Sequence, residues 1–214
     1  MMINRAQKFW DKQANRYDAS EKQFDAVNQQ IIAKTKEYLN PNDTVLDFGC
    51  ATGTKTLLLG DGIKHIYGID FSAEMINEAI KKKNNANADN VTFSQGTIFS
   101  NELAQASFDK IIAFAMVHLL EDSEKTIRRI HELLKPGGLF ISTTACFGDK
   151  MAFKTRLEVT TYLLLKRLGI FALHLNLFTT SGLEKLISNQ HFKIIKSDKM
   201  FNGMTFSFVV AEKS

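Results

Sequence analysis

The sequence predicts an α/β fold: a doubly wound sheet of seven strands, mostly parallel, with helices on both faces and an antiparallel hairpin at the C-terminal end. Three observations predict it. Apolar strand-like runs alternate with helix-like runs through residues 41–146, which is typical of parallel sheets. The first of these runs leads directly into a glycine-rich turn at residues 49–53. The last two apolar runs are joined by a short segment, as in a hairpin.

The predicted strands are short runs of apolar and β-branched residues. The run at residues 110–115 is almost unbroken, which indicates a strand buried on both of its faces. The seven strands are predicted at residues 45–48, 65–69, 91–94, 110–115, 139–144, 192–197 and 204–211.

The predicted helices are marked by apolar residues at helical spacing and by signals at their ends. Ser72 is a suitable N-cap for a helix that continues to Lys83, with Met75 on its apolar face. Pro136 and the two glycines after it end the helix predicted at residues 123–134. The other helices are predicted at residues 54–59, 151–175 and 181–188.

Composition argues against several classes of function. The 27 basic and 23 acidic side chains leave a net charge of only +4, so a nucleic-acid partner is not indicated. Two cysteines, Cys50 and Cys146, are too few for a disulfide framework, and no His/Cys cluster has metal-ligand spacing. We see no signal peptide and no apolar run of transmembrane length. We therefore expect a cytoplasmic protein without a metal, either a monomer or a homodimer.

The glycine-rich turn places small residues where backbone can approach a ligand closely, at the carboxyl end of the first strand. Its spacing, Gly49-x-Ala51-x-Gly53, differs from the Gly-x-Gly-x-x-Gly of dinucleotide sites, and no Gly-Lys-Ser/Thr follows as in a P-loop. Asp47 stands before the turn, where its charge would repel a pyrophosphate and pair with an ammonium group. Asp70 ends the second strand about twenty residues on, within reach of ribose hydroxyls. S-adenosylmethionine, an adenosine that carries a cationic amino acid, fits both carboxylates; the alternative is a tight turn without a ligand.

Five segments in order resemble the class I S-adenosylmethionine-dependent methyltransferases, particularly the small-molecule branch that includes quinone-ring methyltransferases. The segments are VLDFGCATG, IYGIDFSAEMI, VTFSQGTI, FDKIIAFAMVHLL and LLKPGGLFIST. The opening FWDKQANRYD is similar to the N-terminal helix that covers the cofactor in this branch, so the resemblance spans roughly residues 9–145. It implies a Rossmann-like fold, S-adenosylmethionine as cofactor, S-adenosylhomocysteine as product, and a small-molecule methyl acceptor.

The resemblance also implies a set of cofactor-binding residues. Phe71 and Met75 would flank the adenine, and Ala113 would lie beside the sulfonium end. Thr97 stands where the family often has an acid that accepts from the adenine amino group, and a hydroxyl accepts more weakly. Ala51 replaces the commoner glycine, which predicts an ordinary backbone angle there. The implied residues are Tyr17, Asp47, Gly49, Ala51, Gly53, Asp70, Phe71, Met75, Thr97, Ile98 and Ala113.

We expect one domain, because no linker divides the chain. By the resemblance, residues 1–40 form a helical cover and residues 41–146 the cofactor-binding core. Residues 147–190 form the variable helices that cover the substrate, and residues 191–214 the C-terminal strand hairpin.

Catalysis and acceptor choice depend on two less specific features. His118 is the one titratable residue that we place near the end of the fourth strand, where it would act either as a general base or as a packed side chain. Residues 151–180 are rich in Leu and Phe. They predict helices that pack on the core, an apolar cover for a hydrophobic or aromatic acceptor, or transient contact with a membrane surface, since Lys and Arg side chains flank the apolar positions.

Two other functions stay open. Tyr162 and Lys166 match the Tyr-x-x-x-Lys pattern of NAD(P)-dependent short-chain reductases, but Asp47 does not suit the glycine fingerprint of that class. A methyltransferase-like fold without activity would serve as a binding protein. The intact Asp47 and Asp70 argue against this, because a silent protein has no need of them.

Overall fold

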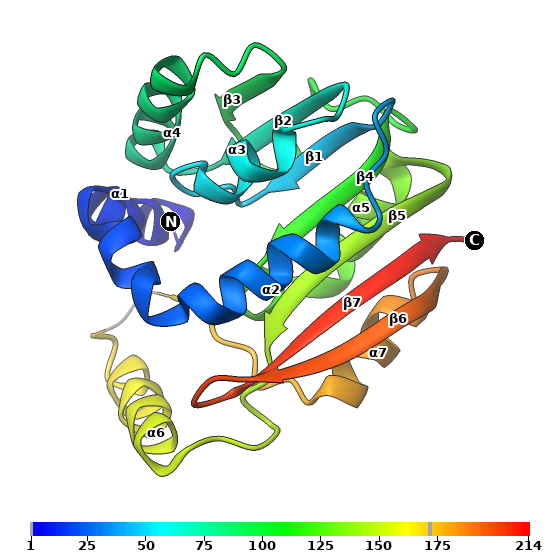
Figure 1. Cartoon of the computed structure of the whole chain (residues 1–214). Coiled ribbons are helices and arrows are strands. Elements are labelled where there is room, and N and C mark those ends of the chain that lie inside the picture. The colour runs from blue at the N-terminus through cyan, green and yellow to red at the C-terminus, as the bar shows by residue number, and fades with distance from the viewer. Residues whose placement is uncertain (1, 171–172) are drawn as a thin grey trace.

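The computed structural model describes residues 2–170 and 173–214, with side chains from residue 5 onward. Within these residues the chain forms a seven-stranded sheet in the order β3-β2-β1-β4-β5-β7-β6 (Figure 1). Strand β7 is antiparallel to both of its neighbours, β5 and β6, whereas strands β1 to β5 pair with one another in parallel. This is the predicted fold class. The strands are β1 (Thr44–Phe48), β2 (His65–Asp70), β3 (Val91–Gln95), β4 (Phe108–Phe114), β5 (Leu134–Ala145), β6 (Phe192–Phe201) and β7 (Thr205–Lys213).

The order of the strands creates a switch point beside β1. Successive connections run outward from β1 to β2 and β3, and the chain then returns to place β4 on the other side of β1. Asp47 of β1 lies in register with Gly68 of β2 and with Ile112 of β4. Ligands of doubly wound sheets bind in the crevice at the carboxyl ends of the strands at such a point. The candidate site is therefore expected immediately after Asp47.

Helices cover both faces of the sheet because apolar side chains recur on one side of each. One buried cluster contains Ile31 of α2, Leu59 of α3 and Ile76 of α4. The other contains Ile130 of α5 and Leu183 of α7. The bounds of these helices are α2 (Asp25–Lys36), α3 (Thr54–Gly60), α4 (Ala73–Ala86), α5 (Ser123–Leu133) and α7 (Thr180–Ser188).

Two helices lie apart from these layers. Helix α1 (Met2–Glu21) lies at the carboxyl edge of the parallel strands and is joined to α2 by the short 3-10 helix η1 (Lys22–Phe24) (Figure 1). Helix α6 (Phe153–Arg167) follows β5 and stands off the sheet (Figure 1). Both helices are therefore near the edge at which the candidate site is expected.

Several predicted boundaries were wrong, and their physical reasons differ. The helix predicted at residues 151–175 is α6 alone; it ends at Arg167, and Gly169 follows at φ 75°. Residues 171 and 172 lie outside the described residues. Strand β5 already begins at Leu134, because Leu134 pairs with Phe108 across a register shift that accommodates Pro136. The predicted N-cap is confirmed, since the Ser72 hydroxyl accepts from the Met75 N–H at 3.2 Å.

None of the helices in the described part of the chain has the length and apolar character needed to cross a bilayer.

Candidate cofactor site

Backbone hydrogen bonds join the turn after β1 to the neighbouring strand β2. The N–H groups of Gly49 and Cys50 both donate to the Ile69 carbonyl, at 2.8 and 3.1 Å. Gly49 has φ 78°, a left-handed conformation that glycine adopts without strain. The space that a side chain at Gly49 would need is filled by Met116, whose sulfur would lie 2.5 Å from an added Cβ. Met116 was not predicted, because only the folded chain brings the end of β4 over this turn.

Gly53 has a structural role besides the predicted cofactor contact. It has φ 74° and forms the N-cap position of α3. An added Cβ would lie 2.5 Å from Cζ of Phe93, a side chain of β3. Glycine at this position therefore lets α3 pack closely on the sheet, which is a structural requirement independent of any ligand.

The backbone at Ala51 is not ordinary, so that prediction was wrong. Ala51 has φ 49°, in the left-handed region that costs a residue with a Cβ roughly 1–2 kcal/mol. The conformation has an evident reason, because the Ala51 N–H donates to Oδ2 of Asp70 at 3.1 Å. The strain at Ala51 is thus held in place by the carboxylate that ends β2.

Asp70 stabilises two turns at the carboxyl edge of the sheet, the one after β1 and the one after β2. Its Oδ2 accepts from Ala51, and its Oδ1 accepts from the Ser72 N–H at 2.9 Å. Burial raises the pKa of Asp70, although these backbone donors favour the charged form. An ionised carboxylate has about four acceptor positions. Asp70 therefore keeps capacity for hydroxyl donors while it fixes the turns.

Asp47 is a buried carboxylate in the wall of a cavity. It is 2% exposed, and its Oδ2 accepts from the Thr56 hydroxyl at 2.5 Å. Burial raises the pKa of Asp47 to about 6, with Thr56 and the Lys55 ammonium acting in the opposite direction. A buried carboxylate with one hydroxyl partner is costly to ionise. A cationic ligand group would relieve that cost by direct pairing.

The cavity beside Asp47 lies between the glycine-rich turn and the N-terminal helices. Its volume is about 600 Å³, within the usual size range of small-molecule sites. Of the predicted cofactor residues, it brings together Tyr17, Asp47, Gly49 and Ala51. The lining also includes Ile32, Leu58 and Phe114, together with Asp18, Glu21, Asp25, Asn28, Gln29, Cys50, Thr52, Thr54, Lys55 and Lys82.

Tyr17 is one of the cofactor residues that the family resemblance implies. It belongs to α1 and lines the cavity. Its ring stands edge-on to Trp10, with ring centroids 6.2 Å apart. Burial, reinforced by the charge of Glu21, raises the pKa of the Tyr17 hydroxyl far above its usual value. The hydroxyl is therefore a neutral hydrogen-bonding group at physiological pH.

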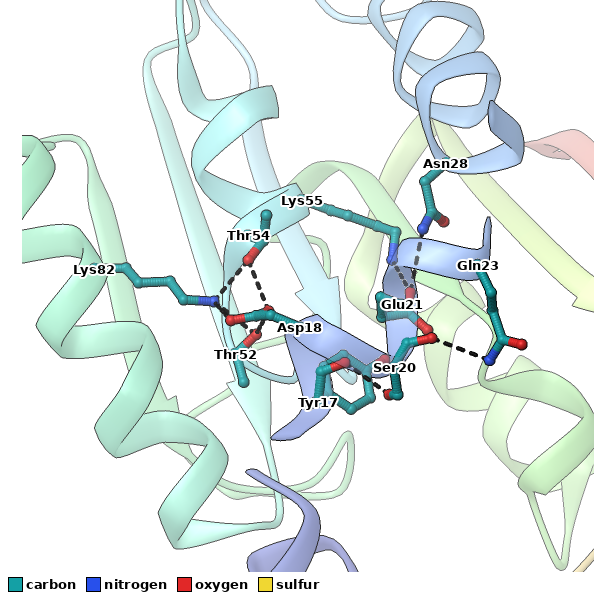
Figure 2. A network of polar contacts seen from close by, with 10 residues as sticks. All are labelled: Tyr17, Asp18, Ser20, Glu21, Gln23, Asn28, Thr52, Thr54, Lys55 and Lys82. Carbon is teal, nitrogen blue, oxygen red and sulfur yellow. Dashed lines mark hydrogen bonds and ion pairs between the residues drawn. The ribbon is translucent and has the colours of Figure 1, made fainter. Parts of the chain in front are cut away.

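Polar contacts hold α1 across the opening, and sequence reasoning missed them. Asp18 accepts from the hydroxyls of Thr52 and Thr54, at 2.6 and 3.2 Å, and pairs with Lys82 of α4 (Figure 2). The ammonium of Lys82 also donates to both threonines, at 2.9 and 2.7 Å. These four residues form one network, called the α1 clasp below.

A second set of contacts lies further along α1. Lys55 of α3 pairs with Glu21 at 2.8 Å, and Asn28 of α2 donates to the same carboxylate oxygen at 3.3 Å (Figure 2). At the middle of α1, Asp11 accepts from the Ser72 hydroxyl at 2.6 Å. The sequence signal was the row of acids at positions 11, 18 and 21 on one helix. Their lysine and hydroxyl partners become evident only after folding.

The residues predicted for the adenine lie on the other side of Asp70 and do not line this cavity. Phe71 is half-buried, whereas Met75 and Ile98 are each 1% exposed. The Thr97 hydroxyl accepts from the Phe99 N–H at 3.2 Å, within a turn after β3. Ala113 is fully buried in β4. These positions stay predictions for cofactor binding.

His118 lies in the 3-10 helix η2 (Val117–Leu119) after β4 and does not line the cavity. Its ring stands edge-on to Phe147, with centroids 5.6 Å apart, and its buried Nδ1 has no hydrogen-bond partner among the described residues. Burial lowers the pKa of His118 to about 4. The main chain at His118 is fixed without any contact of the ring, since the His118 carbonyl accepts from the Asn176 N–H at 2.7 Å.

The buried Asp47 carboxylate in the cavity beside the glycine-rich turn would repel a pyrophosphate and would pair with an ammonium group. This carboxylate, together with the order of the strands, indicates a class I S-adenosylmethionine-dependent methyltransferase. Known proteins agree with this assignment. The family model described as "Methyltransferase domain" matches residues 39–162, and the chain belongs to that family. The protein is accordingly an S-adenosylmethionine-dependent methyltransferase.

Relatives of known sequence and structure lie at moderate distance. An uncharacterized methyltransferase of Geobacillus sp. (strain WCH70) is 29% identical over 156 residues, covering 70% of this chain and 71% of the relative. The YcgJ protein of Bacillus subtilis superposes with a TM-score of 0.69 at 17% identity, covering 86% and 98% of the two chains. Phosphoethanolamine N-methyltransferase 2 of Haemonchus contortus, solved with S-adenosylhomocysteine, gives 0.71 at 16% identity, covering 86% and 53%. At these identities the two structures support the fold alone.

Proposed function

We propose that the enzyme transfers the methyl group of S-adenosylmethionine to a small apolar or aromatic molecule. The cofactor supplies an electrophilic methyl group on a sulfonium, and the protein supplies orientation and desolvation. The observation that carries the proposal is the buried Asp47 carboxylate in a cavity that also exposes Ile32, Leu58 and Phe114. The quinone-ring branch stays a prediction within this class.

The proposed cofactor roles are those that the family resemblance implies, and the hydrogen-bonding capacity of Asp47 and Asp70 agrees with them. Asp47 accepts from the ammonium group, which replaces the solvation that burial removes. Asp70 accepts from the ribose hydroxyls while it holds the Ala51 N–H. Phe71 and Met75 flank the adenine, and Tyr17 excludes water from the amino-acid end. The remaining members of the proposed set are Gly49, Ala51, Gly53, Thr97, Ile98 and Ala113.

The proposed acceptor position is at the ends of β4 and β5. Phe114 ends β4 and lines the cavity. Asn176 ties the segment after α6 to this end, because its side-chain amide donates to the Leu120 carbonyl at 2.7 Å. We therefore retain residues 147–190 as the acceptor-binding part of the chain. His118 keeps its two predicted roles, a packed side chain or a base for an acceptor that must lose a proton, and its lowered pKa makes orientation the main contribution to the rate.

A product screen tests this function. Purified enzyme receives S-adenosylmethionine labelled in the methyl group, together with small-molecule extracts separated into organic and aqueous pools. We expect label in an organic-extractable product, and none with the Asp47→Asn variant, whose fold is checked by circular dichroism. Label confined to protein or nucleic acid would contradict a small-molecule acceptor. Label in the aqueous pool alone would contradict an apolar one.

A further inference from the structure

Helix α6 has an outer face that none of the residues described by the structure covers. None of its fifteen residues is buried. Its largest exposed apolar side chains are Phe153, Leu157 and Leu164, with exposed fractions of 83%, 58% and 60%, and the C-cap residue Leu168 is 66% exposed. A helix of this length is marginal on its own in water. We therefore expect a further contact, beyond those made by the described residues, to stabilise α6.

The four exposed apolar residues form one stripe. Their positions differ by 4, 7 and 4 residues, and a helix turns about 100° per residue, so all four fall within an arc of about 60°. Of the half-buried side chains, Thr155, Val159, Tyr162 and Lys166 lie on the opposite side, and Leu163 and Leu165 lie between the two sides. The stripe therefore points away from the sheet along the whole length of α6.

Cations flank this stripe on both sides. By the same helical spacing, Arg156 and Arg167 border one side and Lys154 the other. Glu158 is the one acid of α6 and lies 3.9 Å from Lys154. Four Lys and Arg against one Glu leave the helix with a charge of +3. An apolar stripe bordered by cations is complementary to a surface with negative charges above an apolar layer.

Neighbouring segments extend the same kind of surface. Phe201, at the end of β6, is 54% exposed and lies under the Lys150 ammonium, 5.5 Å from its ring centroid. The turn beside it is bonded to the start of α6, since the Ala152 N–H donates to the Gly203 carbonyl at 2.8 Å. Ile170, beyond the other end of α6, is also exposed.

We propose that α6 is an interfacial helix that docks the enzyme on an anionic lipid bilayer. The stripe enters the boundary between headgroups and acyl chains, and Lys154, Arg156 and Arg167 meet lipid phosphates. This inference goes beyond the proposed function, since docking requires neither the cofactor nor an acceptor. Because α6 stands near the edge that carries the cavity (Figure 1), docking brings that edge close to the bilayer.

Vesicle co-sedimentation tests the proposal with the full chain. The vesicles contain phosphatidylcholine alone, or phosphatidylcholine with phosphatidylglycerol. One variant is Leu164→Gln with Leu168→Gln, since Gln matches Leu in helix propensity. A second is Arg156→Gln with Arg167→Gln. The matched control is Ile195→Gln with Lys64→Gln, which alters one exposed apolar and one exposed basic side chain outside α6.

We expect the wild type and the control to partition at least about tenfold more onto the anionic vesicles, and added salt to weaken this binding. Each α6 variant should lose on the order of tenfold in partitioning, with an unchanged thermal shift on adding S-adenosylhomocysteine. Equal binding by the leucine variant and the control would overturn the proposal. So would a dimer, detected by sedimentation velocity, that the leucine variant dissociates, because a second copy would then cover the stripe.

Discussion

The carboxylate of Asp70 accepts a hydrogen bond from the backbone N–H of Ala51, a residue held at φ 49°. This one contact joins the glycine-rich turn after β1 to the end of β2. It gives Asp70 a structural task besides the proposed binding of ribose. A loss of cofactor affinity on replacing Asp70 would therefore combine the loss of the proposed ribose contact with a disturbed turn. The role of the turn is tested separately by a substitution at Ala51.

Replacing Ala51 with glycine should stabilise the free enzyme by about 0.5–1 kcal/mol. The left-handed conformation costs an alanine roughly 1–2 kcal/mol, which glycine would not lose. The greater conformational freedom of glycine in the unfolded chain cancels part of this stabilisation. Urea unfolding measures the effect. Ala106→Gly is the matched control, because Ala106 has φ 50° at an exposed position. If Ala51→Gly destabilises while Ala106→Gly stabilises, the Ala51 methyl group makes a contact that outweighs the strain.

Asp47→Asn should stabilise the free enzyme at neutral pH. The pKa of Asp47 is raised to about 6 in the folded protein. The carboxyl group therefore contributes stability that is complete below its ordinary pKa. This contribution is lost as the pH rises through about 6, where the buried group must ionise. The amide of the substituted asparagine stays neutral and can still accept from Thr56. The gain above pH 7 should be on the order of 2 kcal/mol, measured by urea unfolding at pH 5 and pH 8. An equal difference between variant and wild type at both pH values would contradict the raised pKa.

The same pKa predicts how cofactor affinity depends on pH. Below about pH 6 the protonated Asp47 no longer pairs with an ammonium group, so the affinity for S-adenosylhomocysteine should fall as pH falls through this value. Calorimetric titration from pH 5 to pH 8 measures this. An affinity that does not change over this range would argue that Asp47 has no ionic role.

The α1 clasp should affect cofactor retention more than stability. Lys82→Met removes the cation that joins Asp18 to both threonines, and a partly exposed pair is worth roughly 0.2–1 kcal/mol. We expect the KM for S-adenosylmethionine to rise several-fold, by the same energy, with kcat little changed. Lys81→Met is the control, because the one ion pair of the neighbouring Lys81 among the described residues is with Glu78 along the same helix. Identical KM values for the two variants would show that the clasp does not hold the site closed.

His118→Gln separates a general base from a packed side chain. With a pKa lowered to about 4, the ring is neutral at physiological pH and a weak proton acceptor, so we expect kcat to fall less than about tenfold. A loss of 10²–10⁴-fold with unchanged cofactor affinity would instead identify a general base.

Acid stability gives a second readout for His118. A lowered pKa contributes stability that is complete above the ordinary value of 6.5 and is lost as pH falls toward about 4. The Gln variant should lack this component of acid unfolding. The same acid sensitivity in variant and wild type would show that His118 is not the group responsible.

Much of the site was predictable because its signals are local. Asp47, Gly49 and Asp70 follow from spacing alone, since a strand, a turn and the next strand fix their relative positions. Ser72 was predictable as an N-cap for the same reason.

The rest depends on contacts between distant segments. The left-handed Ala51 needs Asp70 to hold it, Gly53 is required by Phe93, and the α1 clasp joins residues 34 and 64 positions apart. The helix predicted at residues 151–175 was too long because Leu and Phe continue past its end. Gly169, two residues after Arg167, was the overlooked C-terminal signal.

The central claim is that Asp47 receives the amino group of an adenosine-linked amino acid. Isothermal titration of wild type and Asp47→Asn at pH 8 tests it, with S-adenosylhomocysteine and with 5′-methylthioadenosine, which lacks the amino-acid group. We predict that the variant loses on the order of a hundredfold in affinity for S-adenosylhomocysteine and none for methylthioadenosine. Equal losses for both ligands, or no loss for either, would contradict the assignment.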